Sequence, residues 1–229
     1  MSYFITGTDT GVGKTLVSCA LLHAYAAQGK RVVGFKPVAA GCGENDRNED
    51  AERLRAASNI LATYGQINPY CFVPPVAPHI AARHTGVRID LGRILTSFRE
   101  LSSQADEVVV EGAGGFLIPL NEKQDGGHLA RELALPVILV VGIRLGCINH
   151  ALLTLKVIDD YGLVCAGWVA NILDGGMLAL KENIDALQQR IPAPLLGIIP
   201  YQHSINMNVV AGMLDIRLLE KDVQSGQIV

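Results

Sequence analysis

Nearly continuous apolar runs separated by helix-compatible segments are the feature of this 229-residue sequence that most constrains its fold. Four of the runs are predicted to be buried strands: 107–110, 137–142, 166–170 and 195–199. Strands that are apolar on both faces are typical of a parallel sheet covered by helices on each side. Two shorter runs, 3–6 and 31–35, are predicted to precede them. The sequence therefore predicts one doubly wound α/β domain over residues 1–229, with a mostly parallel sheet.

The stretches between the apolar runs are predicted to form the covering helices. They are expected at 14–28, 48–62, 91–103, 147–161, 178–190 and, in the least readable part of the sequence, 207–220. The segment 69–78 holds four prolines and is predicted to be an irregular loop or short excursion, not a domain boundary. No internal repeat or low-complexity linker interrupts the pattern.

Composition argues against several classes of function. The formal net charge is −3 and no basic block occurs, so nucleic-acid binding is not expected. The longest apolar runs, such as 135–143, are too short to span a bilayer, so no membrane association is expected. The first residues carry no basic region before a glycine-rich loop, which predicts a cytoplasmic protein without a secretory leader.

The five cysteines are expected to be reduced thiols. Their number is odd and none belongs to a C-x-x-C pair: Cys19, Cys42, Cys71, Cys147 and Cys165. Such a set fits a cytoplasmic protein better than a disulfide framework or a zinc site.

A glycine-rich segment connects the first predicted strand to the first predicted helix. It reads GTDTGVGKT over residues 7–15, in the strand–loop–helix context that a phosphate-binding loop requires. Backbone N–H groups at Gly11, Val12 and Gly13 would face phosphate oxygens, Lys14 would reach the β- and γ-phosphates, and Thr15 would bind Mg²⁺. The loop is one residue longer than usual, and a glycine-rich turn without a ligand is the alternative.

Two carboxylates are candidates for the same Mg²⁺ ion. Glu111 ends the apolar run 107–110 and is followed by Gly-Ala-Gly-Gly, which keeps side chains out of the crevice. A strand-end residue in a local hydrogen bond is the alternative. Asp50 lies in the first turn of a predicted helix, where the helix dipole alone explains an acidic residue.

Two further polar residues stand at the ends of predicted strands, where open parallel sheets bind their ligands. Lys36 precedes Pro37 and would place a second cation near the γ-phosphate, although most lysines are simply solvated. Asn171 ends the run 166–170 and could contact a nucleotide base, or else form a turn.

A third cluster joins a predicted strand to the helix 147–161. Gly146 and Cys147 would present N–H groups at the helix N-terminus, and Asn149 could add a side-chain donor, which together suit a carboxylate. His150 stands three residues after Cys147, so a nucleophile–base pair is conceivable. The alternative is a core cysteine, and no third group that would orient such a pair is evident.

Six segments together resemble the dethiobiotin synthetase family. They read FITGTDTGVGKT (4–15), GFKPVA (34–39), EGAGG (111–115), VILVVGIRLGCINH (137–150), GWVAN (167–171) and PAPLLGIIP (192–200). The similarity extends over most of residues 1–200 and includes the longer phosphate loop. It implies a P-loop NTPase-like fold and formation of dethiobiotin from 7,8-diaminononanoate, CO2 and ATP with Mg²⁺. A carbamate and a carbamic–phosphoric anhydride would be the intermediates, and no protein nucleophile is implied.

The resemblance also assigns roles to individual residues. The Mg²⁺ ligands would be Thr15, Asp50 and Glu111. The carbamate and phosphates would be contacted by Thr10, Lys14 and Lys36. The substrate carboxylate would be held by a loop of the neighbouring subunit with Gly146, Cys147 and Asn149, which implies a homodimer with shared sites. The adenine pocket would contain Asn171 and Pro200.

The sequence departs from the family pattern at two positions. Ala40 stands at a substrate-binding position where the family often has serine, so a hydroxyl contact is lost or replaced by water. Ile172 stands where a carboxylate is common, which puts strict selectivity for the base in doubt. The segment 121–129 and the C-terminal tail match poorly, and no residue is assigned from them.

A partitioning-type P-loop ATPase, stimulated by a partner surface, is the alternative function with the same fold. Such proteins usually carry an additional lysine early in the loop, where this sequence has Thr8, Asp9 and Thr10. A small-molecule kinase is less well supported because no arginine-rich lid is evident.

Overall fold

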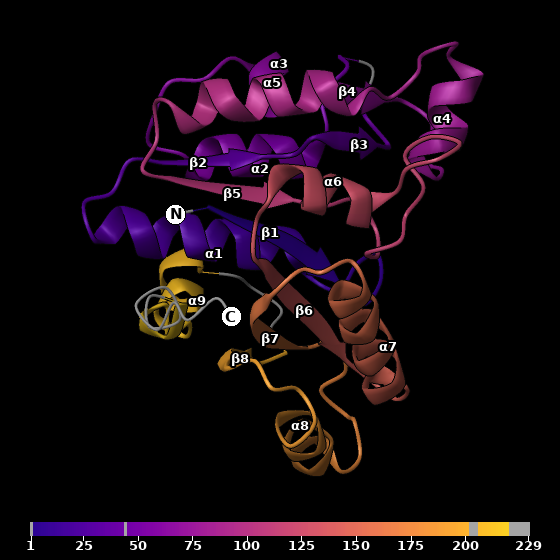
Figure 1. Cartoon of the computed structure of the whole chain (residues 1–229). Helices are drawn as coiled ribbons and strands as arrows, with labels where there is room; N and C mark the ends of the chain where they lie inside the picture. Colours follow the sequence, from indigo (N-terminus) through magenta and orange to yellow (C-terminus); the bar gives the residue numbers. More distant parts are fainter. Residues whose placement is uncertain (1, 44, 202–205, 220–229) are drawn as a thin grey trace.

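A six-stranded parallel sheet forms the centre of the computed structural model, which describes residues 2–43, 45–201 and 206–219 (Figure 1). In sheet order the strands are β2 (Val32–Phe35), β5 (Glu107–Glu111), β1 (Ser2–Gly7), β6 (Val137–Ile143), β7 (Cys165–Ile172) and β8 (Leu195–Ile199). All neighbouring pairs are parallel, so the carboxyl ends of the strands share one edge. The predicted doubly wound, P-loop NTPase-like α/β fold is confirmed.

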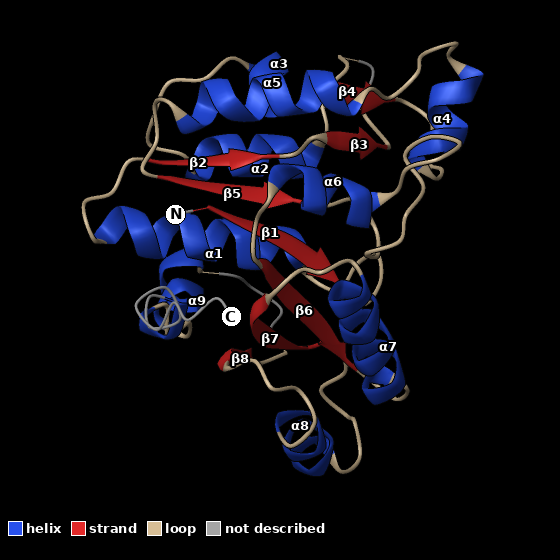
Figure 2. Ribbon diagram, in the orientation of Figure 1, coloured by secondary structure: helices blue, strands red, loops and turns tan. Residues whose placement is uncertain are grey.

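Helices cover both faces of this sheet (Figure 2). One face carries α1 (Lys14–Ala27), α2 (Glu49–Ala57) and α9 (Met207–Gly212), and the other carries α5 (Leu91–Ser102), α6 (Gly126–Leu133), α7 (Cys147–Asp160) and α8 (Leu180–Gln188). Side chains of β1 alternate between the two: Tyr3 and Ile5 pack in the cluster with α1, and Phe4 packs in the cluster with α5. None of the described helices is long and apolar enough to cross a membrane.

The helix predicted over 48–62 is shorter in the structure and ends at Ala57. The reason is that the next two side chains bond to the edge strand β2. The N–H of Gly34 donates to Ser58 Oγ (2.9 Å), and the N–H of Val32 donates to Asn59 Oδ1 (2.7 Å). Polar residues that sequence analysis counted as helix therefore satisfy backbone groups at the edge of the sheet.

A small second sheet replaces part of the loop expected over 69–78. Strands β3 (Val38–Ala40) and β4 (Tyr70–Phe72) pair in parallel beside β2, and the short helices α3 (Tyr64–Ile67) and α4 (Pro78–His84) flank β4 in sequence. Within 69–78, the expectation of an irregular loop is therefore wrong for β4 and for Pro78, which begins α4, and the segment is the short excursion that was the other expectation. Each strand is three residues long, too short to leave a recognisable pattern.

The expectation that all five cysteines are reduced is also wrong. A disulfide joins Cys42, just after β3, to Cys71 in β4, with the two Cα atoms 6.1 Å apart. Cys19, Cys147 and Cys165 are free. The two joined residues are 29 positions apart, and only the pairing of β3 with β4 brings them together, so no sequence spacing could reveal the bond.

The helix predicted over 207–220 ends at Gly212 in the structure, and residue 220 lies outside the described part of the chain. After α9 the backbone turns back to the edge strand β8, where the N–H of Asp215 donates to the carbonyl of Leu196 (2.8 Å). Gly197 permits this contact, because a Cβ there would lie 2.3 Å from the carbonyl oxygen of Met213.

Candidate active site

The phosphate loop occupies the turn between β1 and α1, at the carboxyl edge of the sheet. Gly11 and Gly13 have φ angles of 74° and 94°, which disfavour residues with a Cβ. A Cβ on Gly13 would also lie 2.3 Å from Nδ2 of Asn171. The side chain of Val12 is buried beneath the loop and lines no pocket, so this residue offers only its backbone.

Lys14 begins α1 and is almost completely buried. Its Nζ donates to the carbonyl oxygen of Asp9 (2.8 Å), which holds the side chain over the loop. Burial, and after it the charge of Lys36, lower the pKa of Lys14 to about 8, although Glu111 and Asp50 oppose the shift. The loop therefore holds a cation that lacks full compensation, as a site for phosphates requires.

Glu111 ends β5 and is fully buried. Its Oε1 accepts hydrogen bonds from Thr15 Oγ1 (2.9 Å) and from Lys36 Nζ (2.5 Å). Among the described residues no group donates to its other oxygen, Oε2. A buried carboxylate oxygen without a partner is costly and points to a ligand that completes the site.

Lys36 lies between β2 and β3 and connects the two predicted carboxylates. Besides Glu111, its Nζ contacts Oδ2 of Asp50 at 3.2 Å. Burial acts to lower the pKa of Lys36, but the charges of Glu111 and Asp50 outweigh it and raise the pKa. Burial likewise acts to raise the pKa of Asp50, but the charge of Lys36 outweighs it and lowers the pKa. Both groups are therefore charged around neutral pH.

The donor set fits Mg²⁺. Thr15, Asp50 and Glu111 offer one hydroxyl and two carboxylates, and Glu111 Oε2 is the orphaned oxygen among them. Mg²⁺ prefers such hard oxygen ligands and usually takes one or two carboxylates together with phosphate oxygens and water. No group of three or more His, Cys, Asp or Glu residues that could hold a metal occurs in the described part of the chain.

Two pockets meet at these residues. The first, of about 410 Å³, is lined by ten of the predicted residues: Thr10, Gly11, Gly13, Lys14, Thr15, Lys36, Asp50, Glu111, Asn171 and Pro200. The second, of about 470 Å³, shares Thr10, Lys36, Asp50 and Gly114 with the first and continues past Ala40 to the segment 75–78. Volumes of roughly 300–1,000 Å³ are typical of small-molecule sites. The arrangement therefore offers two adjacent ligand sites with Lys36 between them.

The far end of the first pocket contains the residues predicted to contact adenine. Asn171 and Pro200 line it together with Ile172 and Tyr201. Asn171 ends in a buried amide whose Nδ2 donates to the carbonyl of Val12 (2.9 Å), so this side chain also fixes the phosphate loop. The side chain of Ile172 offers no hydrogen-bonding group to a base at this end of the pocket.

The cluster at the start of α7 lines neither pocket of its own chain. Cys147 is buried, and its N–H donates to the carbonyl of Arg144 (3.0 Å). Gly146 and Asn149 are exposed, and Leu145 beside them is 92% exposed. His150 is exposed while the thiol of Cys147 is buried, so the geometry offers no support for a nucleophile–base pair.

Sequence analysis missed several residues of the site. Arg53 and Gly114 line the first pocket, and Asn48 lines the second while capping α2. The signal for Asn48 was available, since an asparagine before an acidic first turn is typical of an N-cap. Nothing in the sequence singled out Arg53 from Arg55, the other arginine of α2.

Comparison with known proteins identifies the family. A family model described as an AAA domain matches residues 1–208. The ATP-dependent dethiobiotin synthetase BioD of Nitrosospira multiformis is 57% identical over 214 residues, covering 93% of this chain and 94% of the relative. BioD of Aromatoleum aromaticum is 54% identical, covering 93% and 96%. The chain belongs to the ATP-dependent dethiobiotin synthetase family. The predicted family, the enzyme class and ATP as co-substrate are thereby confirmed.

Solved structures of other proteins have a fold similar to that of this chain. The MinD cell division protein of Aquifex aeolicus matches with a TM-score of 0.55 at 17% identity and covers 100% of this chain and 98% of that one. A ParA family ATPase from Chlorobium tepidum matches with a TM-score of 0.54 at 14% identity, covering 99% and 94%. These identities show a shared P-loop fold alone, so they lend no functional support to the partitioning-type alternative against dethiobiotin synthetase.

Proposed function

We propose that this chain, acting as one P-loop α/β domain, closes the ureido ring of dethiobiotin from 7,8-diaminononanoate, CO2 and ATP. The observation that carries the proposal is the meeting of two pockets at Lys36, Asp50 and Thr10. A nucleotide in the first pocket would direct its γ-phosphoryl group toward a substrate in the second. Family membership at 57% identity supports the same reaction.

The chemistry needs no protein nucleophile. One amine captures CO2 as a carbamate and loses a proton. A carbamate oxygen attacks the γ-phosphorus of ATP, and the bond to the ADP oxygen breaks. The second amine then attacks the carbonyl carbon of the carbamic–phosphoric anhydride and loses a proton, and inorganic phosphate leaves as the ring closes. The products are dethiobiotin, ADP and phosphate.

The residues around the junction of the pockets position and neutralise these groups. The N–H groups of the loop and Lys14 would bind the phosphates, since Lys14 is buried without full compensation. Lys36 would stabilise negative charge on the carbamate and the transferred phosphoryl group. Thr10 is exposed, lines both pockets and offers its hydroxyl to the carbamate.

Thr15, Asp50 and Glu111 would hold Mg²⁺ in this proposal. When bound, the ion supplies charge neutralisation at the β- and γ-phosphates. The unpartnered Oε2 of Glu111 supports the assignment. Lys36 adds a positive charge between the two carboxylates, with its Nζ 3.2 Å from Asp50 and 2.5 Å from Glu111.

We also propose a cytoplasmic homodimer in which each chain completes the site of the other. The start of α7, with Gly146, Cys147 and Asn149, would hold the substrate carboxylate in the second copy, where the N–H of Cys147 would exchange its bond to the Arg144 carbonyl for one to the carboxylate. The support is that these residues line neither of the two pockets described above, although a helix N-terminus suits a carboxylate.

The decisive test is phosphate release from ATP, Mg²⁺ and bicarbonate, with and without 7,8-diaminononanoate, together with detection of dethiobiotin by mass. We expect phosphate release that depends on the diamine and matches dethiobiotin in amount. ATP turnover that is indifferent to the diamine, without dethiobiotin, would refute the proposal and favour a partner-stimulated ATPase.

A further inference from the structure

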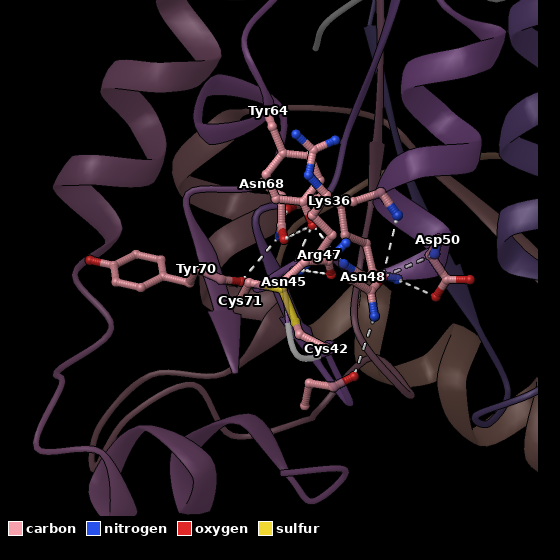
Figure 3. The surroundings of a disulfide bond; sticks show 12 residues. Lys36, Cys42, Asn45, Arg47, Asn48, Asp50, Tyr64, Asn68, Tyr70 and Cys71 are labelled. Atoms are coloured by element: carbon pink, nitrogen blue, oxygen red, sulfur yellow. Dashed lines mark hydrogen bonds and ion pairs between the residues drawn. A yellow bond between two sulfur atoms is a disulfide. The ribbon is translucent and has the colours of Figure 1, made fainter. Parts of the chain in front are cut away.

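The disulfide between Cys42 and Cys71 lies beside the second pocket of the proposed active site (Figure 3). Residues 38–40 of β3, just before Cys42, form one wall of this pocket, and residues 75–78, just after β4, form another. The disulfide therefore ties together the two segments between which the second ligand would bind. Two backbone hydrogen bonds join the same segments. The N–H of Cys42 donates to the carbonyl of Phe72 (3.0 Å), and the N–H of Gly41 donates to the carbonyl of Pro74 (3.3 Å).

A continuous series of contacts leads from the disulfide to Asp50. The Sγ of Cys71 lies 3.7 Å from the hydroxyl of Tyr64, and this hydroxyl accepts a hydrogen bond from the N–H of Asn48 (2.7 Å). Asn48 is buried, and its Oδ1 accepts from the N–H of Asp50 (3.0 Å). Figure 3 shows these side chains converging from β4, α3 and the start of α2.

The same contacts reach Lys36. The hydroxyl of Tyr64 donates to Oδ1 of Asn68 (3.1 Å), and Nδ2 of Asn68 donates to the carbonyl of Lys36 (2.6 Å). Both Asn68 and Lys36 are buried. The disulfide is thus connected to the backbone of the two residues, Lys36 and Asp50, that stand between the pockets.

The disulfide is the covalent link between β4 and the strap, defined here as residues 41–43 and 45–48; the strap is also tied by the two backbone bonds above and by the bond from Asn48 to Tyr64. Cys42 is buried, but Gly43, Asn45 and Arg47 are exposed. Disulfides that occur in reducing compartments are usually transient and take part in redox chemistry or sensing. Cys71 is partly exposed, so a small reductant can reach the bond.

We propose that Cys42 and Cys71 are a reversible redox modification site whose oxidised form holds Lys36 and Asp50 in position for catalysis. A dithiol reductant attacks one sulfur, the bond between Cys42 and Cys71 breaks, and the second thiol of the reductant resolves the mixed disulfide. Two electrons and two protons pass to the protein, which gains two thiols while the reductant becomes a disulfide. A small-molecule disulfide reverses the reaction.

Reduction removes the covalent link between the strap and β4 and leaves noncovalent contacts such as these hydrogen bonds to hold the strap and Asn48. We therefore expect the half-saturating Mg²⁺ concentration and the KM for the diamine to rise by at least about threefold, since small displacements of positioning groups are costly. Binding of ADP without Mg²⁺ depends mainly on the phosphate loop, which lies outside this set of contacts, and should change little.

The test begins with a count of free thiols in the denatured protein, alkylated before and after treatment with dithiothreitol. We expect three free thiols before treatment, those of Cys19, Cys147 and Cys165, and five afterwards. Five free thiols in protein that has been exposed to a small-molecule disulfide would overturn the proposal.

Kinetics then compare oxidised wild type, reduced wild type, C42S and C71S, with C165S as the matched control. We expect both C42S and C71S to behave like reduced wild type and to ignore dithiothreitol, and C165S to keep the full response. Equal Mg²⁺ requirement and diamine KM in oxidised and reduced wild type would refute the proposal. That comparison needs no variant, so a misfolded C42S would not obscure the answer.

The comparison of diamine KM values rests on the proposed function. A second measurement, ADP affinity with and without Mg²⁺, does not need the synthetase reaction. The gain in ADP affinity on adding Mg²⁺ depends on Asp50, and we expect it to be smaller in the reduced protein. If diamine-dependent turnover fails while this difference persists, the synthetase proposal fails and the redox site stands. If turnover succeeds and the difference is absent from both readouts, the redox proposal alone is wrong.

Discussion

At the scale of single residues, Lys36 connects the two carboxylates with the two pockets. It is buried, pairs with Glu111 and Asp50, and borders both pockets. We expect K36A to lower kcat by about 10²- to 10³-fold, a loss typical of one electrostatic group at a transition state. ADP should still bind, because the phosphate loop remains.

Phosphate release and calorimetric titration with ADP measure the two effects. R55A is the control, since Arg55 lies exposed on α2 and pairs with Glu52 outside the first pocket. Near-normal turnover of folded K36A would remove Lys36 from the active site.

Lys14 gives a prediction about pH. Its pKa is lowered to about 8 by burial and by Lys36, so at pH 9 most of the free protein carries a neutral Lys14. Phosphates stabilise the charged form and raise this pKa, so nucleotide binding takes up a proton at pH 9, and affinity falls as pH rises above about 8. Titration calorimetry at pH 9 in buffers of different ionisation enthalpy measures the uptake.

Two comparisons sharpen this experiment. At pH 7 Lys14 is already charged, so the heat of binding should carry no proton uptake by this group. K14M should lose the uptake at pH 9 if it still binds ADP. Proton uptake of the same size in K14M would assign it to a different group.

Cys147 provides a test of the proposed chemistry without a protein nucleophile. Its thiol is buried, while the neighbouring His150 is exposed. We expect C147S to keep turnover within about threefold of wild type, because its backbone N–H at the helix N-terminus is retained. Complete loss of turnover in a folded C147S, judged by circular dichroism, would restore the nucleophile hypothesis.

At the scale of elements, the cap of α2 links helix stability to the site. Asn48 accepts hydrogen bonds from the N–H groups of Asp50 and Ala51, so N48A should destabilise the protein by about 1 kcal/mol. Because Asp50 is the second residue of α2, N48A should also raise the Mg²⁺ requirement. Thermal unfolding and Mg²⁺ titration of turnover measure the two effects.

Asn206 is the matched control for this experiment. It caps α9 in the same way, with its side chain accepting from the N–H groups of Asn208 and Val209, but it lines neither pocket of the site. N206A should therefore lose stability without a change in Mg²⁺ requirement. An equal Mg²⁺ shift in both variants would show that Asn48 acts through stability alone.

The elements also show what a sequence can and cannot reveal. The six strands of the large sheet were predictable because burial on both faces makes them almost purely apolar. Helix α6 was missed, since it opens with Gly126 and Gly127, and its support is a capping box between Asp125 and His128. Strands β3 and β4 were missed because pairing, not pattern, defines such short segments.

The residues of the site also divide into those marked by a sequence pattern and those that only the fold brings together. Glu111, Lys36 and Asn171 were noticed because each directly follows a predicted strand, and the phosphate loop has its own spacing. Asp50 gave no signal beyond an acidic first turn and was assigned only by family resemblance. The disulfide and the place of Asn48 in its contacts depend on the fold, which brings Cys71 next to Tyr64 and Tyr64 next to Asn48.

At the scale of the whole molecule, the remaining question is how the exposed start of α7 takes part in catalysis. In the proposed homodimer, the phosphate loop and Lys36 of one chain face Gly146 and Asn149 of the other. A chain with K36A keeps an intact α7 start, and a chain with G146V keeps an intact Lys36. Gly146 has a φ of 92°, so valine there should distort this turn without touching either pocket.

Mixing these two inactive chains tests the shared site. After unfolding and refolding together in equal amounts, half of the dimers are mixed, and each mixed dimer has one complete site of two. Recovery of about a quarter of wild-type turnover is therefore expected for a site shared across an isologous interface. If each site were complete within one chain, the mixture would stay as inactive as its components, because neither chain alone would hold both Lys36 and an undistorted α7 start.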